Sequence, residues 1–152
     1  MRAIILSTVL SFGLAASAVA APVVADIKVS IGPDLAKKAD TYGAQEFDIL
    51  STELKRSIER QVKLRPGGGT LNLVIEDATP NRPTPGQLFK TQGLSVQSFG
   101  VGGARITGDY VDPTGVRTPI DYNWYETDIR WARYGATWHD AETAFDLSLI
   151  HI

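Results

Sequence analysis

The stretch SFGVGGARITGDYVDPTGVRTPID, residues 98–121, predicts a β-hairpin, the best defined element of the chain. Side chains at positions 104, 106, 108 and 110 fall on one face of an extended strand, and those at 105, 107 and 109 fall on the other. Asp112, Pro113 and Gly115 then occupy the first, second and fourth positions of a type I turn, where each of these residue types is favoured. The chain is therefore expected to reverse its direction at this turn.

A returning strand is predicted after the turn, because alternation resumes at residue 117. One face of this strand carries Ile120, Tyr122 and Trp124, and the other carries Asp121, Asn123 and Tyr125. Gly102 and Gly103, just ahead of the first strand, indicate a β-bulge or a close approach between backbones. A phosphate-binding loop is the alternative, but no GK[ST] sequence and no helical pattern follow these glycines.

A strand, a long helix and a second strand are predicted ahead of the hairpin. Residues 25–31 and 71–76 alternate between apolar and polar side chains, as half-buried strands do. Between them, residues 44–64 carry apolar side chains at steps of three and four: Phe47, Leu50, Leu54, Ile58 and Val62. Pro66 and the glycines at 67–69 end this helix. The order strand, helix, strand predicts a crossover that leaves the two strands parallel.

A long connection is predicted at residues 79–95, with the sequence NRPTPG at residues 81–86. Three roles fit it: a proline-containing segment that binds a partner, a lid over a site, and a plain connection. Loops of this length in compact domains are often functional or mobile, so a binding role remains open beside the other two. Asn81 and Arg82 are the candidate binding residues of this loop.

Aromatic residues are concentrated after the hairpin. Trp124, Trp131, Trp138 and Phe145 are spaced by seven residues, but Gly135 argues against one continuous helix. Two interpretations of the aromatic side chains remain open. Either they form the core between sheet and helix, or Trp124, Tyr125, Trp131 and Tyr134 form a platform on which sugar rings or peptidoglycan stack.

A final helix is predicted to begin near Thr137, whose hydroxyl can cap it, and to bury Trp138, Ala141 and Phe145. The fold class is therefore α+β. We expect a mostly antiparallel sheet of about four strands, in the order β-α-β-β-β-α, with the long helix and the C-terminal helix on one face.

The first 21 residues have the pattern of an export signal. Arg2 is followed by an apolar stretch at residues 3–14 and by the small-residue motif Ala18-Val19-Ala20. Cleavage is expected after Ala20 or Ala21, which would leave residues 22–147 as a single domain in the periplasm or outside the cell. An uncleaved membrane anchor is the alternative, but the apolar stretch is short and interrupted by serine and threonine, so no integral span is expected after cleavage.

Composition narrows the classes of partner and cofactor. Without the signal, the chain has 14 basic and 17 acidic side chains, which argues against nucleic acid and anionic lipid held by bulk charge. The chain has no cysteine, so it has no disulfide framework and no thiolate metal site. No metal-binding motif and no cofactor-binding motif is present, and we predict neither group.

The motifs SFGVGGA (98–104), Asp112-x-x-Gly115 and Trp138-His139-Asp140-Ala141, together with the order of elements, resemble a group of uncharacterised bacterial envelope domains. These are small exported proteins or lipoproteins of unknown function. The resemblance covers most of the mature chain and implies an α+β fold related to the accessory domains of envelope secretion and translocation proteins. Its motifs consist of glycines and packing residues, so it assigns no catalytic residue. The lipidated cysteine of the lipoprotein members is absent from this chain.

The C-terminal sequence Leu147-Ser148-Leu149-Ile150-His151-Ile152 resembles translated sequencing-adapter read-through. We interpret residues 148–152 as a non-native tail. On this interpretation His139 is the only native histidine of the chain.

Three functions follow, in order of preference. The first is a non-catalytic envelope protein that binds another envelope component through the 79–95 loop, the hairpin or a sheet edge. The second is a carbohydrate or peptidoglycan binder that uses exposed aromatic side chains. The third is a hydrolase built on Asp109 and Asp121, which could face each other across the hairpin, and on His139.

Overall fold

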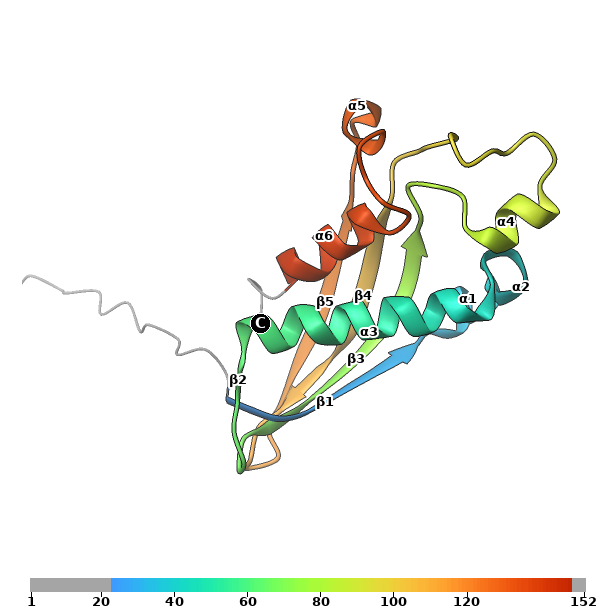
Figure 1. Cartoon of the computed structure of the whole chain (residues 1–152). Coiled ribbons are helices and arrows are strands. Elements are labelled where there is room, and N and C mark those ends of the chain that lie inside the picture. Colours follow the sequence, from blue (N-terminus) through green and yellow to red (C-terminus); the bar gives the residue numbers. More distant parts are fainter. Residues whose placement is uncertain (1–22, 149–152) are drawn as a thin grey trace, which may run out of the picture.

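The structure is a computed structural model that describes residues 23–148. A five-stranded sheet is covered on one face by two long helices, α3 and α6 (Figure 1). The elements in chain order are β1 (Val23–Ile31), α1 (Pro33–Ala36), α2 (Ala39–Tyr42), α3 (Ala44–Gln61), β2 (Lys63–Leu64), β3 (Gly69–Thr79), α4 (Pro85–Lys90), β4 (Gly103–Val111), β5 (Arg117–Tyr125), α5 (Ile129–Ala132) and α6 (His139–Ser148). The strand order across the sheet is β2-β1-β3-β4-β5.

The predicted crossover is confirmed. Strands β1 and β3 are parallel neighbours, with Ile27 opposite Leu71 and Ile31 opposite Ile75, and α3 connects them across one face. The apolar stripe of α3 is buried against the sheet, because Leu50, Leu54 and Ile58 are fully enclosed there.

The predicted hairpin is also confirmed, with β4 and β5 paired from Gly103 opposite Tyr125 to Val111 opposite Arg117. The amide of Gly115 donates to the carbonyl of Asp112 at 3.0 Å, and the φ angle of Gly115 is +91°, a conformation that favours glycine. The Asp112 side chain accepts from the amide of Thr114 at 2.8 Å, so this aspartate stabilises the turn as expected.

The final helix closes the core over β4 and β5. As predicted, Trp138, Ala141 and Phe145 are buried, although α6 begins at His139, two residues later than expected. The spacing of seven between aromatic residues has no structural meaning, since Trp124 belongs to β5, Trp131 to α5 and Phe145 to α6.

Three details of the predicted fold are wrong. The long helix ends at Gln61, and Lys63 and Leu64 form β2, a short fifth strand parallel to the start of β1. Two of the four strand pairings are parallel, so the sheet is mixed and not mostly antiparallel. The 79–95 segment is not a plain loop, because it contains α4, which starts with a capping box between Thr84 and Gln87.

The other face of the sheet is polar, and no helix of residues 23–148 covers it. A bulge in β3 between Ile75 and Asp77 places both Glu76 and Asp77 on this open face. The hydroxyl of Thr107 donates to Glu76 at 2.7 Å, and Arg105 pairs with Asp121 at 3.1 Å. Charged side chains that pair across neighbouring strands keep this face solvated.

Two predictions fall on residues that the structure does not describe. The export signal at residues 1–21 lies outside the described residues, and so do residues 149–152 of the predicted tail. Ser148 is the last described residue, and it is a buried part of α6. Among residues 23–148, no helix has the length and apolar character that crossing a bilayer requires.

Candidate functional site

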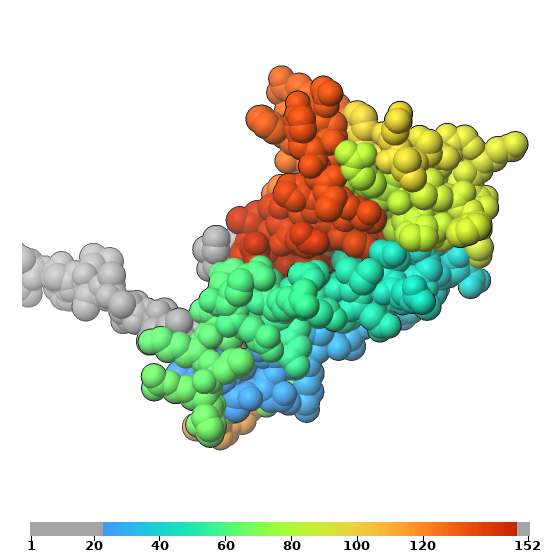
Figure 2. Space-filling model, viewed as in Figure 1, coloured from blue at the N-terminus to red at the C-terminus, as the bar shows by residue number. Residues whose placement is uncertain are grey.

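Large apolar side chains are exposed at one end of the sheet. Thr79 of β3, Gly103 of β4 and Tyr125 of β5 are register partners, so the connections that follow β3, precede β4 and follow β5 all leave the sheet at this end. We call the exposed apolar residues on these connections the apolar end; they are Phe89, Leu94, Val96, Phe99, Val101, Ile129, Trp131 and Tyr134. Phe89 is 93% exposed, Trp131 64% and Tyr134 75%. Figure 2 shows the segment with α5 projecting from this end, beside the α4 segment and the chain that follows it.

Arg82 links the two segments that carry the apolar end. Its guanidinium donates to the carbonyls of Gly135 at 2.9 Å and Arg133 at 2.7 Å, both just after α5, and to the carbonyl of Val96 at 3.4 Å. A planar guanidinium with five N–H donors can hold several carbonyls in fixed directions at once. Arg82 was predicted to bind a partner directly, and the structure shows it bonded to three carbonyls of the chain itself.

Arg82→Ala is expected to loosen the apolar end without unfolding the domain. We predict faster amide hydrogen exchange in residues 94–101 and 129–135, with unchanged protection of β3 and β4, because only the connections lose their contacts. The measurement is amide exchange by mass spectrometry. Arg82→Lys is the matched control for charge and should behave like the alanine variant, since one ammonium cannot reproduce the planar fork. Unchanged exchange in both variants would show that Arg82 does not hold the segments.

Asn81 is buried under the apolar end and bonded to Asp140 at the start of α6. The Asn81 amide nitrogen Nδ2 donates to Asp140 Oδ2 at 2.5 Å, and Asn81 Oδ1 accepts from the Asp140 backbone N–H at 2.8 Å. Asp140 Oδ2 also accepts from the amide of Gly102 at 2.8 Å. These bonds fix the relative positions of the β3 exit, the β4 entry and α6, so Asn81 positions the connections and offers no free polar group on the surface.

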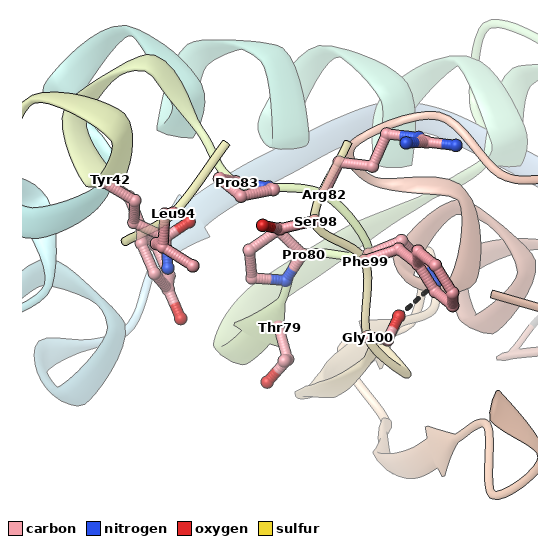
Figure 3. Close-up of a pocket in the computed structure, with 11 residues that line it drawn as sticks. Tyr42, Thr79, Pro80, Arg82, Pro83, Leu94, Ser98, Phe99 and Gly100 are labelled. Atoms are coloured by element: carbon pink, nitrogen blue, oxygen red, sulfur yellow. Dashed lines mark hydrogen bonds between the residues drawn. The ribbon is translucent and has the colours of Figure 1, made fainter. Parts of the chain in front are cut away.

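A pocket of about 240 Å³ lies beside Arg82, between the β3 exit and the chain that enters β4 (Figure 3). Its lining includes Tyr42 and Leu94 on one side, Phe99 on the other, and Pro80 and Pro83 between them. Polar residues complete the lining, among them Thr79, Gln87 and Ser98, so the pocket offers apolar walls beside hydrogen-bonding groups, a mixture that suits a side chain of a partner.

A second hollow, of about 410 Å³, is formed by the α5 segment alone. Arg130, Trp131, Arg133 and Tyr134 line it. The Arg133 guanidinium carbon lies 5.1 Å from the centre of the Tyr134 ring, a cation–π contact. Arg130 is bonded to Asp128 at 2.6 Å, whereas no carboxylate of the described residues pairs with Arg133.

The four residues of the predicted aromatic platform do not share one surface. Trp124 packs against the core on the helix side of β5. Tyr125 lies on the open face, where its hydroxyl donates to Asp77 at 2.7 Å. Trp131 and Tyr134 are together on the α5 segment, and they are the two exposed members.

A polar cluster lies around the β3 bulge on the open face. Asp77 accepts from Lys38 at 2.6 Å and from Tyr125, and a hollow of about 400 Å³ is lined by Asp34, Lys38, Glu76, Asp77, Arg105 and Thr107. Burial on its own would raise the pKa of Asp77, but the hydrogen bonds from Lys38 and Tyr125 outweigh it and lower this pKa. Burial and the hydrogen bond to Asp77 raise the pKa of Tyr125.

This cluster predicts a loss of stability in acid. The pKa of Asp77 is below its ordinary value of 3.8 in the folded chain, so the unfolded chain takes up a proton first as the pH falls. The stability that the Asp77 contacts provide is therefore present above about pH 4 and is lost as the pH drops through the folded-state pKa. Urea unfolding of the wild-type chain and of Asp77→Asn between about pH 7 and about pH 2 measures it.

The difference in unfolding free energy between the two chains should shrink towards low pH. A difference that stays constant over the whole range would contradict the lowered pKa of Asp77.

The residues of the hydrolase hypothesis are not assembled into one site. Asp109 lies opposite Pro119 and Asp121 opposite Thr107, so the two carboxylates do not face each other directly across the hairpin. Asp109 is bonded to Arg117 and Asn72, and Asp121 to Arg105. His139 is on α6, which covers the opposite face of the sheet, and residues 23–148 contain no group of three metal-ligating side chains.

Sequence reasoning missed several residues of this region. The capping box Thr84-Pro85-Gly86-Gln87 was a usable signal for α4, with proline at the first helical position. Phe89 lies in this short helix, so its place on a helix could have been predicted from the same signal. The Asn81–Asp140 pair had no local signal, because its members lie 59 positions apart.

Comparison of the chain with protein-family models and with curated proteins gives no match.

Proposed function

We propose that the chain is an exported, non-catalytic domain of the cell envelope that binds a partner protein through its apolar end. The observation that carries this proposal is the gathering of exposed apolar and aromatic side chains on two connections that Arg82 holds together. Exposed apolar patches of this kind on small domains usually mark interaction surfaces, and aromatic residues and arginine are the residue types that dominate binding energy.

Charge favours a partner with an acidic surface. The connections at residues 79–102 and 126–137 contain four basic residues, Arg82, Lys90, Arg130 and Arg133, and two acidic ones, Glu126 and Asp128, while the whole chain has a net charge of −2. Both acids are used within the chain: Glu126 accepts from the amides of Thr127 and Asp128, and Asp128 pairs with Arg130. Arg133 and Lys90 therefore remain available to carboxylates of a partner.

The absence of an assembled set of reacting groups in the described residues favours binding over catalysis. A nucleophilic or acid–base site needs a base within hydrogen-bond reach of the group that it activates. His139 is exposed at the start of α6, on the face of the sheet opposite to Asp109 and Asp121, and these two carboxylates are already paired with Arg117 and Arg105. The export part of the proposal is supported by the signal-like pattern of residues 1–21.

Binding of sugars or peptidoglycan is the second candidate, and the α5 hollow is the observation that favours it. Trp131 and Tyr134 offer exposed ring faces, and Arg130 and Arg133 add hydrogen-bond donors beside them. An aromatic ring with polar groups at its edge suits the apolar face of a sugar ring.

Photo-crosslinking in the exporting cell tests the first candidate. A photoreactive phenylalanine analogue replaces Phe89 or Trp131 at the apolar end, and Val116 as the control. Val116 is 60% exposed but lies in the hairpin turn at the opposite end of the sheet, so it reports random encounters. We expect a discrete protein adduct from positions 89 and 131, reduced by charge reversal in Arg133→Glu, and none from position 116. Equal labelling at all three positions, or none, would refute the docking role.

Tryptophan fluorescence separates the two candidates. Trp131 is the one strongly exposed tryptophan, while Trp138 is 3% exposed, so quenching by acrylamide reports mainly on Trp131. Protection of this fluorescence on addition of peptidoglycan fragments, lost in Trp131→Phe, would favour the sugar-binding function. If the peptidoglycan fragments do not change the quenching of this fluorescence, protein docking remains the proposed function.

A further inference from the structure

Strand β5 forms one edge of the sheet, and no described residue pairs with its outer side. We propose that this outer edge pairs with the same edge of a second copy of the chain, in antiparallel orientation and centred on Asn123. The proposal concerns a surface apart from the apolar end and goes beyond the docking function proposed above.

The register of the hairpin decides which backbone groups of β5 face outward. The amide of Asp112 donates to the carbonyl of Val116 at 2.9 Å, and the amide of Glu126 donates to the carbonyl of Gly102 at 3.0 Å. Hydrogen-bonded pairs alternate with non-bonded pairs along an antiparallel ladder, so positions 118, 120, 122 and 124 bond to β4. Positions 117, 119, 121, 123 and 125 therefore direct their backbone groups away from β4.

The features that block strand addition lie in the first half of this edge. Position 119 is a proline, so the outer edge has no N–H donor there, and Arg117 places a charge ahead of it. Asn123 and Tyr125 carry outward N–H and C=O groups with no proline or charged side chain between them. An unprotected edge of this kind is a ready template for another strand.

The edge is complementary to itself. A two-fold axis through Asn123 places Asp121 of one copy opposite Tyr125 of the other and Asn123 opposite Asn123, and all of these positions have outward backbone groups. Each Pro119 falls opposite Thr127, beyond the end of β5, so no donor is missing within the paired segment. The same arrangement sets Tyr122 of one copy opposite Trp124 of the other on the helix side, a favourable aromatic cross-strand pair.

The other edge of the sheet is less suited to pairing. The outer side of β1 is already occupied at Val23 and Val24 by β2. Asp26 and Lys28 follow along β1, and charged side chains on an edge strand oppose the approach of another strand.

Sedimentation equilibrium of the purified exported chain tests the proposal with a matched pair of variants. Asn123→Pro removes an outward N–H and no bond to β4, whereas Asn123→Ala removes only the side chain and keeps the N–H. We expect a dimer for the wild-type chain and for Asn123→Ala, and a dimer dissociation constant about 10- to 100-fold larger for Asn123→Pro. Far-UV circular dichroism tests whether the proline variant folds. If that variant does not fold, Asn123→Lys is used instead, because it sets two like charges opposite each other at the two-fold axis.

Amide hydrogen exchange by NMR distinguishes an edge dimer from any other dimer. In the dimer, the amides of Asp121, Asn123 and Tyr125 should be protected, and their protection should fall on dilution, while position 120 stays protected throughout by β4. A chain that is monomeric at its highest soluble concentration would overturn the proposal. A dimer in which Asn123→Pro has no effect, or in which these three amides exchange freely, would also overturn it.

Discussion

Trp138→Ala is expected to lower the free energy of unfolding by about 3–5 kcal/mol, because it opens a large cavity in the core. Trp138 is 3% exposed and lies edge-on to Tyr42, with ring centres 5.7 Å apart and planes at 73°. Its indole N–H donates to Glu46 Oε2 at 2.7 Å, and Glu46 is itself buried. The substitution therefore removes packing between α2, α3 and the residue just ahead of α6, and it also leaves a buried carboxylate without this donor.

Urea or thermal unfolding measures this loss of stability, and two further variants serve as comparisons. Trp138→Phe keeps most of the ring volume and should cost less than the alanine variant, with the remaining loss due mainly to the Glu46 hydrogen bond. Trp131→Ala removes an equally large but exposed ring and should change stability by no more than about 0.5 kcal/mol. Equal losses for Trp138→Ala and Trp131→Ala would mean that the two rings are not in the different environments that the structure shows.

The sequence predicted those elements whose pattern is local. Alternation in β1 and β3, the stripe from Phe47 to Ile58 in α3, and the Asp112-to-Gly115 turn each reflect burial of one face of a single element or the demands of a single turn. The predicted end of α3 was wrong because Val62 leaves the helix: Val62 has φ −99° and ψ 154°, and the next two residues pair with β1. Two residues are too few for a recognisable strand pattern, so β2 could not be foreseen.

The candidate site was less predictable, for a physical reason. Exposure of Trp131 and burial of Trp138 depend on where the chain between β5 and α6 leaves the core, and the two residues look alike in the sequence. Arg82 bonds to backbone carbonyls, which have no side-chain signature, and these lie 14 to 53 positions away along the chain. The sequence therefore indicated the right segments for the connections at this end but not the role of their residues.

Asn81→Asp is expected to destabilise the fold by about 3–5 kcal/mol at neutral pH, because it places two carboxylates against each other inside the protein. Asn81 Nδ2 is the donor that lies 2.5 Å from Asp140 Oδ2, and an aspartate at position 81 has no donor to offer there. It also loses the bond from Nδ2 to the carbonyl of Gly100 at 3.2 Å. The connection that enters β4 would keep only its backbone bond to the β3 exit, from the amide of Gly100 to the carbonyl of residue 81 at 2.8 Å, so the apolar end should loosen together with the core.

The loss of stability in the Asn81→Asp chain should become smaller as the pH falls. As the pH falls, one of the two facing carboxylates can take up a proton and act as a donor to the other, so the Asn81→Asp chain should regain stability relative to the wild type. Urea unfolding at about pH 7 and about pH 4 measures this change. Asp140→Asn is the matched control: it removes the charge, keeps one acceptor for Gly102, and should show no such recovery.

Combining Asn81→Asp with Asp140→Asn separates charge from shape. The double variant restores a donor–acceptor pair between positions 81 and 140, so it should be more stable at neutral pH than Asn81→Asp alone. The rescue should be partial, because one amide group cannot use the same atom both to donate to the new carboxylate at position 81 and to accept from Gly102. A double variant no more stable than Asn81→Asp would mean that the fit of the Asn81 amide, and not the charge beside it, connects α6 to the apolar end.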